Sequence, residues 1–158
     1  YFREEIDLLY GIFILILILD QLTKYFAVKF LMNGESYVII KDFLQLEYVE
    51  NFGAAFGILQ YRKIFFIIIT LAVIIAVIFY LKRNYYYINR PMKVALTMLL
   101  AGAVGNFIDR VRLGYVIDFI HVNFGKFYDF PVFNIADSFI VISTILIVYM
   151  VLLNKYEK

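Results

Sequence analysis

Four long apolar runs constrain this chain more than any other feature of its sequence. They cover about residues 8–26, 64–81, 93–108 and 135–153. A helix needs about 20 apolar residues to cross the hydrocarbon of a bilayer, and each run approaches that length. With 64% hydrophobic and 18% charged residues, a chain this short cannot hide its apolar side chains in a soluble core. We therefore predict an all-α membrane protein with four transmembrane helices.

The segment between the first two runs has a different period. Apolar and polar residues alternate along part of it, which is typical of a half-buried strand. We predict a small sheet, a β-cradle, over about residues 36–51. It would lie on the membrane surface, with Leu44, Leu46 and Tyr48 facing apolar material. The other large connection, about residues 109–133, is predicted as a loop.

The basic residues predict how the helices are oriented. An even number of spans places both termini on one side, together with the loop between the second and third spans. Lys82, Arg83, Arg90 and Lys93 crowd that short loop, which holds no acidic residue. Because cytoplasmic loops are enriched in Lys and Arg, we predict cytoplasmic termini and long extracytoplasmic loops. The whole chain, residues 1–158, is interpreted as a single integral membrane domain.

The composition excludes several kinds of site. The chain has no cysteine, which removes disulfides, thiolate metal sites and Cys nucleophiles. It has one histidine, His121, so a histidine metal cluster cannot be assembled, and we predict this residue to lie on the surface in a loop. The net charge of +2 is too small to indicate a nucleic-acid partner. We predict neither a metal nor another cofactor.

Four aspartates fall where charge is expensive. A charged side chain at the centre of a bilayer costs at least about 2.5–3.5 kcal/mol. On the predicted topology, Asp20, Asp109, Asp118 and Asp137 all lie at the outer edge of the membrane. Lys24 lies one helical turn from Asp20, so these two side chains can pair. The pair either ends the first span, with the lysine reaching the interface, or belongs to a site, and we weigh the two equally.

Local interactions explain some of these acids. Asp109 can form an ion pair with Arg110 at a helix end, and we prefer that interpretation. Asn134 can cap the fourth helix, with Asp137 as the acid of its first turn. Asp118 has no such explanation, because apolar residues flank it on both sides.

Small residues recur on one face of the third span. Ala101 and Gly105 are separated by four positions, a spacing that lets a neighbouring helix backbone come close. We predict that they serve helix packing.

Converging carboxylates can carry two kinds of chemistry. Two that approach closely cannot both ionise, so one holds a proton near neutral pH. Such a pair can activate a water and protonate a carbonyl, as aspartic proteases do, and intramembrane carboxylates also serve proton or cation transport. A serine protease built on Ser138 and His121, and a structural scaffold, are further alternatives that the residues leave open.

Five motifs, in order along the chain, resemble the bacterial lipoprotein signal peptidases, the signal peptidase II family. They are DQLTK (20–24), NFGAAFG (51–57), GAVGNFIDR (102–110), VIDF (116–119) and FNIADS (133–138). The resemblance implies an aspartic endopeptidase of the bacterial cytoplasmic membrane, with four transmembrane helices and an extracytoplasmic β-cradle. Its substrates would be diacylglyceryl-modified prolipoproteins, cut just before the lipidated cysteine.

The resemblance also implies residue roles and partners. Asp118 and Asp137 would be the catalytic pair, with the resting proton assigned to neither. The 51–57 stretch would bring backbone close to the substrate or to the pair. The implied partners are lipid-modified prolipoproteins, membrane lipid and globomycin-like inhibitors. The positions that would bind substrate or brace the site are Asp20, Lys24, Asn51, Gly53, Asn106, Asp109, Arg110, Asn134 and Ala136.

Overall fold

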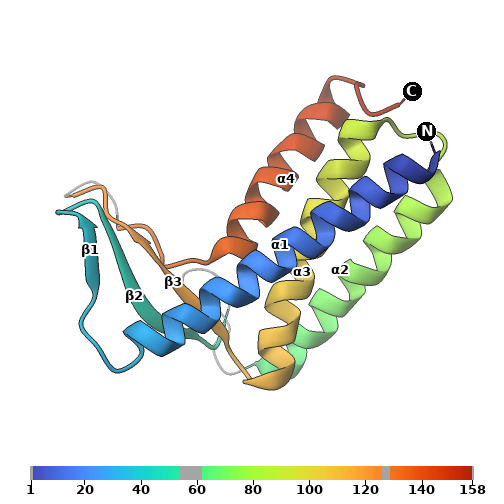
Figure 1. The fold of residues 1–158 in the computed structure, drawn as a ribbon. Coiled ribbons are helices and arrows are strands. Elements are labelled where there is room, and N and C mark those ends of the chain that lie inside the picture. Colours follow the sequence, from blue (N-terminus) through green and yellow to red (C-terminus); the bar gives the residue numbers. More distant parts are fainter. Residues whose placement is uncertain (1, 54–61, 126–128, 158) are drawn as a thin grey trace.

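The computed structural model describes residues 2–53, 62–125 and 129–157. Within these ranges the chain forms four helices and a three-stranded sheet (Figure 1). All four helices are long and apolar enough to cross a membrane, so the predicted four-helix membrane protein with a small sheet is confirmed. In chain order the elements are α1 (Phe2–Leu31), β1 (Tyr37–Ile40), β2 (Leu44–Asn51), α2 (Lys63–Asn84), α3 (Arg90–Arg112), β3 (Val116–Val122) and α4 (Ile135–Leu152).

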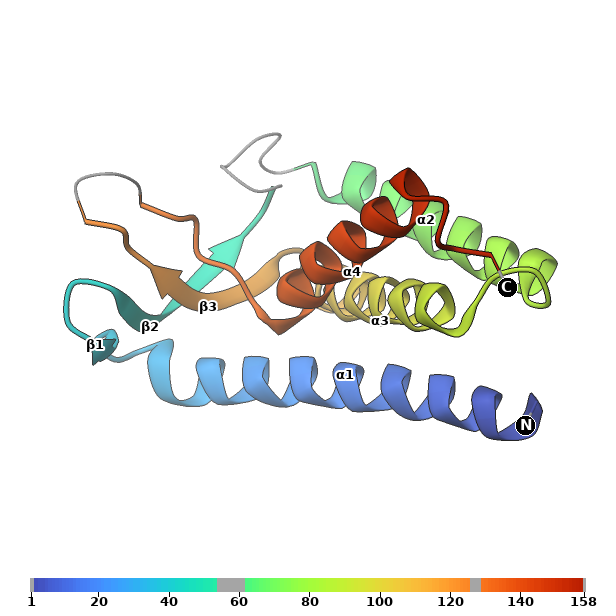
Figure 2. The ribbon, with the colours of Figure 1, turned by 90° about the horizontal axis from the view of Figure 1, so that it is seen from above.

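Helix α1 extends beyond the apolar run that predicted it. The run ended at about residue 26, whereas the helix continues to Leu31 and includes Asp20 and Lys24. At about 1.5 Å per residue, its 30 residues measure about 45 Å, more than the ~30 Å of a hydrocarbon core. Lys29 lies in the last turn, where a cation is favourable beside the negative end of the helix dipole. The helix therefore runs the length of the bundle and ends beside the sheet (Figure 2).

Helix α3 is the centre of the bundle and contacts α1, α2 and α4. Small residues make these contacts close. A Cβ added at Gly102 would lie 2.6 Å from the carbonyl oxygen of Ala136 in α4, so the two backbones meet there without an intervening side chain. Ala101 and Gly105 are buried on the same helix. The prediction that these small residues serve packing is confirmed.

Helix α2 presents most of its surface to the outside. Of its 22 residues only Ile74 and Val77 are buried. Ile64, Ile68 and Phe79 are 72%, 61% and 62% exposed. Contiguous apolar surface of this kind is unfavourable in water and suits a lipid environment. The chain is a multi-pass membrane protein.

The sheet is antiparallel, with the strand order β1-β2-β3. The predicted segment 36–51 supplies its first two strands. The prediction of residues 109–133 as a loop was wrong, because β3 comes from this segment, where β-branched residues favour an extended backbone. The register places Asn51 of β2 opposite Val116 of β3, two residues before Asp118.

The sheet packs against the last turns of α1. Ala27 of α1 forms a buried cluster with Ile117 and Phe119 of β3, and Leu46 and Tyr48 of β2 pack against it. The predicted apolar surroundings of these two β2 residues are confirmed. Successive side chains of a strand point to opposite faces, so the residue between Ile117 and Phe119 faces away from this cluster.

Both ends of the chain lie at one end of the bundle, and the sheet lies at the other (Figure 1). The C-terminal segment is tied to the connection between α2 and α3. Asn89 Nδ2 donates a hydrogen bond to the carbonyl oxygen of Lys155 at 2.6 Å. Asn89 N donates to that of Tyr156 at 2.9 Å. This arrangement agrees with an even number of membrane spans.

Candidate active site

The start of α4 is built as a capping box. Asn134 is the N-cap, and its Oδ1 accepts a hydrogen bond from Asp137 N at 2.9 Å. In return, Asn134 N donates to Asp137 Oδ2 at 3.2 Å. The pairing satisfies two backbone N–H groups and places a carboxylate where the helix dipole favours negative charge. The predicted capping interaction is confirmed, yet it leaves Asp137 Oδ1 and Asn134 Nδ2 for other partners.

Asp118 is enclosed on β3 and is 1% exposed. Its Oδ1 accepts a hydrogen bond from Asn134 Nδ2 at 2.7 Å, and its Oδ2 accepts one from Asn51 Nδ2 at 2.9 Å. Burial and the neighbouring charge of Asp137 raise the pKa of Asp118 to about 7, although the two amide donors oppose the rise. This carboxyl therefore titrates near neutral pH, where an ordinary aspartate is fully ionised.

Asn106 of α3 completes the link between the two aspartates. Its Nδ2 donates to Asp137 Oδ1 at 2.7 Å, and its Oδ1 accepts from Asn134 Nδ2 at 3.2 Å. Each oxygen of Asp118 and Asp137 thus accepts a hydrogen bond from an amide. In the described part of the chain, no group of three or more acidic or histidine side chains could hold a metal ion. Two carboxylates in shared amide contacts are suited to acid–base chemistry.

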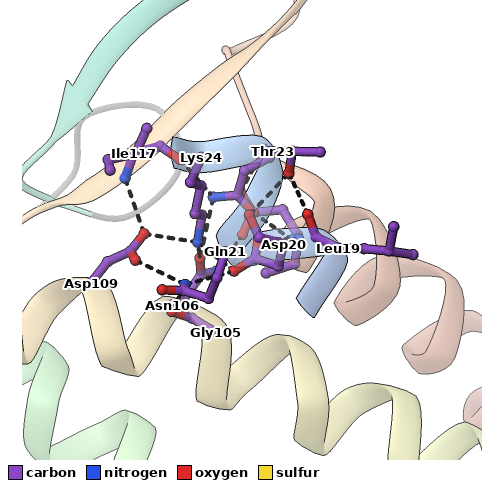
Figure 3. Close-up of polar contacts among 12 residues, drawn as sticks. Leu19, Asp20, Gln21, Thr23, Lys24, Gly105, Asn106, Asp109 and Ile117 are labelled. Carbon is purple, nitrogen blue, oxygen red and sulfur yellow. Dashed lines mark hydrogen bonds and ion pairs between the residues drawn. The ribbon is translucent and has the colours of Figure 1, made fainter. Parts of the chain in front are cut away.

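Asp20, Lys24 and Asp109 form a buried ion cluster (Figure 3), which is linked to Asp137 through Asn106. Lys24 Nζ is 2.9 Å from Asp20 Oδ2 and 2.8 Å from Asp109 Oδ2. It also donates to Asn106 Oδ1 at 3.0 Å. The three charged side chains are at most 3% exposed. The predicted pairing of Asp20 with Lys24 is confirmed, and the lysine points into the protein rather than to the membrane interface.

The preferred pairing of Asp109 with Arg110 was wrong. Asp109 lies on the buried face of α3, where its Oδ2 pairs with Lys24 and accepts a hydrogen bond from Ile117 N at 3.3 Å. Arg110 is one position further, about 100° around the helix. Its guanidinium carbon lies 5.2 Å from the ring centroid of Phe66 in α2. Residues adjacent in a helical sequence do not face each other, which is why adjacency was misleading.

Asp20 joins α1 to the start of α4. Its Oδ1 accepts a hydrogen bond from Ala136 N at 3.0 Å. A Cβ at Gly105 would collide with the Asp20 carboxylate, so the glycine makes room for it. The sequence reasoning missed Gln21, whose Nε2 donates to Asp109 Oδ1 at 3.1 Å and to the carbonyl of Gly105 at 3.3 Å. A second polar residue within an apolar run was the available signal.

Gly53 orients the side chain of Asn51, which contacts Asp118 from the end of β2. Gly53 is buried, and its backbone N donates to Asn51 Oδ1 at 3.0 Å. The opposite end of the same amide, Nδ2, is thereby directed to Asp118. Residues 54–57, the rest of the predicted motif, lie outside the described residues.

His121 lies in β3, so its prediction as a loop residue was wrong. Its Nδ1 is 3.0 Å from Glu47 Oε1, its Nε2 is 2.6 Å from Asp129 Oδ1, and its side chain is 14% exposed. Ser138, the other part of the serine alternative, donates its hydroxyl to the carbonyl of Asn134 at 3.1 Å. Among the described residues, no contact brings this histidine and this serine together.

Known proteins are similar to this chain over nearly its whole length. A family model described as signal peptidase (SPase) II matches residues 12–153. The chain belongs to the signal peptidase II family. The lipoprotein signal peptidase of Clostridium tetani (strain Massachusetts / E88) is 42% identical over 151 residues, which cover 92% of this chain and 94% of the relative. That of Staphylococcus aureus (strain MRSA252) is 46% identical over 149 residues, covering 92% and 90%.

Two solved structures share the fold described above. One is a bacterial membrane enzyme determined by the in meso method at 2.3 Å resolution, with a TM-score of 0.85 and 44% identity over 93% of this chain and 88% of that one. Another, determined by the same method at 1.9 Å, gives a TM-score of 0.81 and 42% identity over 93% and 94%. The chain is therefore a membrane protein of a protease family.

Proposed function

We propose that this chain is an aspartic endopeptidase that removes signal peptides from diacylglyceryl-modified prolipoproteins, cutting just before the lipidated cysteine. Asp118 and Asp137 are its catalytic pair. The observation that carries the proposal is the position of Asn134, which donates to Asp118 Oδ1 at 2.7 Å and to Asp137 Oδ2 at 3.2 Å. The substrate class follows the names of the relatives.

The reaction needs one carboxyl and one carboxylate. Asp137 lies in the first turn of α4, where the helix dipole favours an anion, so we assign it as the base. We assign the resting proton to Asp118, whose pKa is raised by burial to about 7. Asp137 takes a proton from a water whose oxygen bonds to the scissile carbonyl carbon, while Asp118 donates its proton to the carbonyl oxygen. Asp137 then protonates the leaving amine as the C–N bond breaks, and Asp118 recovers its proton from the carbonyl hydroxyl.

The proposed enzyme lies in the bacterial cytoplasmic membrane, with cytoplasmic termini and its site at the extracytoplasmic end. Lys82 and Arg83 in the last turn of α2, at the end opposite the sheet, support this orientation. The lipid of the substrate stays in the bilayer and the signal helix lies beside the spans, so membrane embedding restricts the approach of the scissile bond. Membrane lipid is a further partner, and globomycin-like inhibitors would occupy the same site.

The side chains around the pair brace it or contact substrate. Asn51 and Asn134 hold Asp118 by hydrogen bonds, and Asn106 holds Asp137. The proposed set is Asp20, Lys24, Asn51, Gly53, Asn106, Asp109, Arg110, Asn134 and Ala136.

Single Asp118→Asn and Asp137→Asn variants test the proposal. Each should lower the rate at which a lipid-modified prolipoprotein is cleaved in membranes by on the order of 10³-fold or more, because acid–base catalysis by positioned groups contributes on that scale. Thermal unfolding in detergent checks that both variants are folded. Substantial turnover by either variant would refute the pair.

Ser138→Ala is the matched control, since Ser138 adjoins Asp137 in sequence and, among the described residues, its hydroxyl bonds only to the backbone carbonyl of the N-cap Asn134. It should retain activity. If this variant alone lost activity, a serine mechanism would replace the aspartic one.

A further inference from the structure

The three hydrogen-bond donors of Lys24 are all used inside the protein. A lysine ammonium has three N–H groups and no acceptor. Nζ has one acceptor for each of them, in Asp109 at 2.8 Å, Asp20 at 2.9 Å and Asn106 at 3.0 Å. The side chain is 2% exposed. Lys24 thus has no N–H left for a substrate, so any effect on chemistry must pass through its hydrogen-bond partners or through its charge.

The Asn106 carboxamide has only one orientation that satisfies its neighbours. As placed, Oδ1 accepts from Lys24 Nζ at 3.0 Å and from Asn134 Nδ2 at 3.2 Å, while Nδ2 donates to Asp137 Oδ1 at 2.7 Å. A rotation by 180° would put an NH2 group against two donors and a carbonyl oxygen against a carboxylate. Because an ammonium can only donate, Lys24 enforces this orientation together with the amide of Asn134 and the carboxylate of Asp137.

Asn134 is oriented differently. Its Oδ1 accepts from the backbone N of Asp137, so the start of α4 fixes that amide without help from a charged side chain. The ammonium of Lys24 also acts at longer range, because its charge lowers the pKa of Asp118 against the rise that burial causes. Lys24 therefore acts on Asp137 through the Asn106 amide, and its charge acts on both carboxylates.

We propose that Lys24 is a positioning residue for the aspartate pair: it fixes the Asn106 carboxamide so that it donates to Asp137, and it keeps a positive charge behind both carboxylates. The inference rests on the proposed function. It places the lysine outside the catalytic groups, since its donors are all bound to protein acceptors.

The pH profile of prolipoprotein cleavage tests the charge. Lys24→Met keeps an unbranched side chain that is one atom shorter and removes the ammonium, so both carboxyls should hold their protons to higher pH. We expect the bell-shaped profile of kcat/KM to move up by about one pH unit or more. We expect kcat at the optimum to fall on the order of 100-fold with a small change in KM. Lys93→Met, which removes a buried lysine at the other end of the bundle, should leave the profile in place.

Asp109→Asn should shift the pH profile of kcat/KM in the opposite direction. It removes a negative charge beside Lys24 and leaves the contact with Asn106, so the profile should move to lower pH. A brace that only holds helices together would move neither profile, and unchanged profiles in both variants would overturn the proposal. If Lys24→Met does not fold, Asp109→Asn decides alone: a downward shift supports the proposal, and an unchanged profile overturns it.

A double-mutant cycle tests the route through the amide. If Lys24 acts on Asp137 through Asn106, the losses in kcat caused by Lys24→Met and Asn106→Ala should overlap, so the double variant loses less than their product. Multiplicative losses would refute the route. Failure of the proposed function looks different, because Asp118→Asn or Asp137→Asn would then cleave the prolipoprotein.

Discussion

Two buried lysines join α1 to α3, one at each end of the bundle. Lys24 projects from α1 into a cluster of carboxylates at the sheet end and is 2% exposed. Lys93 projects from α3 at the end that holds the chain termini and is 0% exposed. Its Nζ is 2.9 Å from Glu5 Oε2 in α1 and 3.9 Å from the ring centroid of Tyr85.

The two lysines differ in the residues that their hydrogen bonds and ion pairs reach. The contacts of Lys93 lead to Glu5, whose side chain is 19% exposed and so lies within reach of water. Those of Lys24 continue through Asn106 to Asp137. Buried ion pairs contribute little net stability, because desolvation offsets their attraction. The same residue type between the same two helices thus forms a clamp at one end and a support for the candidate site at the other.

The largest effect should come from removing each lysine. Lys24→Met leaves two carboxylates buried without their cation, which should lower the free energy of unfolding by roughly 3–5 kcal/mol. Lys93→Met leaves Glu5 with access to solvent and should cost about 2 kcal/mol or less. Thermal unfolding in one detergent at fixed pH measures both. Equal losses would mean that the two ends are equally desolvated and would remove the distinction.

The sequence predicted what depends on local pattern. Hydropathy alone located the four helices, because only long apolar runs can cross a bilayer. The capping of α4 by Asn134, with Asp137 three residues on, is also local. The same patterns explain why Asp118 stood out, since no neighbour in sequence could account for a charge among apolar residues.

Contacts between distant segments could not be predicted from pattern. Asp109 was expected to pair with its neighbour Arg110, but its partner Lys24 comes from another helix. Strand β3 was interpreted as a loop because its strand character becomes decisive only when it pairs with β2. Lys93 was counted as a loop charge, whereas it is fully buried in α3. In each case tertiary packing decided the outcome.

Replacing the asparagine N-cap at either end of the bundle gives a second comparison, with a smaller loss of stability than replacing Lys24. Asn134 caps α4 beside the aspartates, and Asn89 caps α3 at the opposite end, accepting from Met92 N at 3.0 Å. Alanine at either position should cost about 1 kcal/mol of stability. Asn134→Ala also removes one of the two amide donors to Asp118 and should lower kcat/KM on the order of 100-fold. Asn89→Ala should leave kcat/KM unchanged, and a comparable loss there would show that cap stability alone controls activity.

The pH dependence of stability gives the last comparison between the two ends. In the folded protein the pKa of Asp118 is raised from 3.8 to about 7. Between these values the unfolded chain releases a proton that the folded chain retains, so folding weakens as pH rises from about 4 to about 7. The full penalty, roughly 4 kcal/mol for a shift of about three units, applies above that range.

Asp118→Asn removes this ionisation penalty but also removes one acceptor for the amides of Asn51 and Asn134. We therefore expect the free energy of unfolding to rise by about 2 kcal/mol at pH of about 8.5. The gain should shrink as the pH falls and become a loss of about 2 kcal/mol near pH of about 4, where the ionisation penalty is nearly absent and the cost of the lost acceptor remains. Melting temperatures across this range measure it. Glu5→Gln is the counterpart at the other end, where breaking the pair with Lys93 should lower the melting temperature at pH of about 8.5. If Asp118→Asn and Glu5→Gln changed the melting temperature in the same direction, the distinction between the two ends would be contradicted. Ionisation should lower stability at Asp118, which is held for chemistry, and not at Glu5.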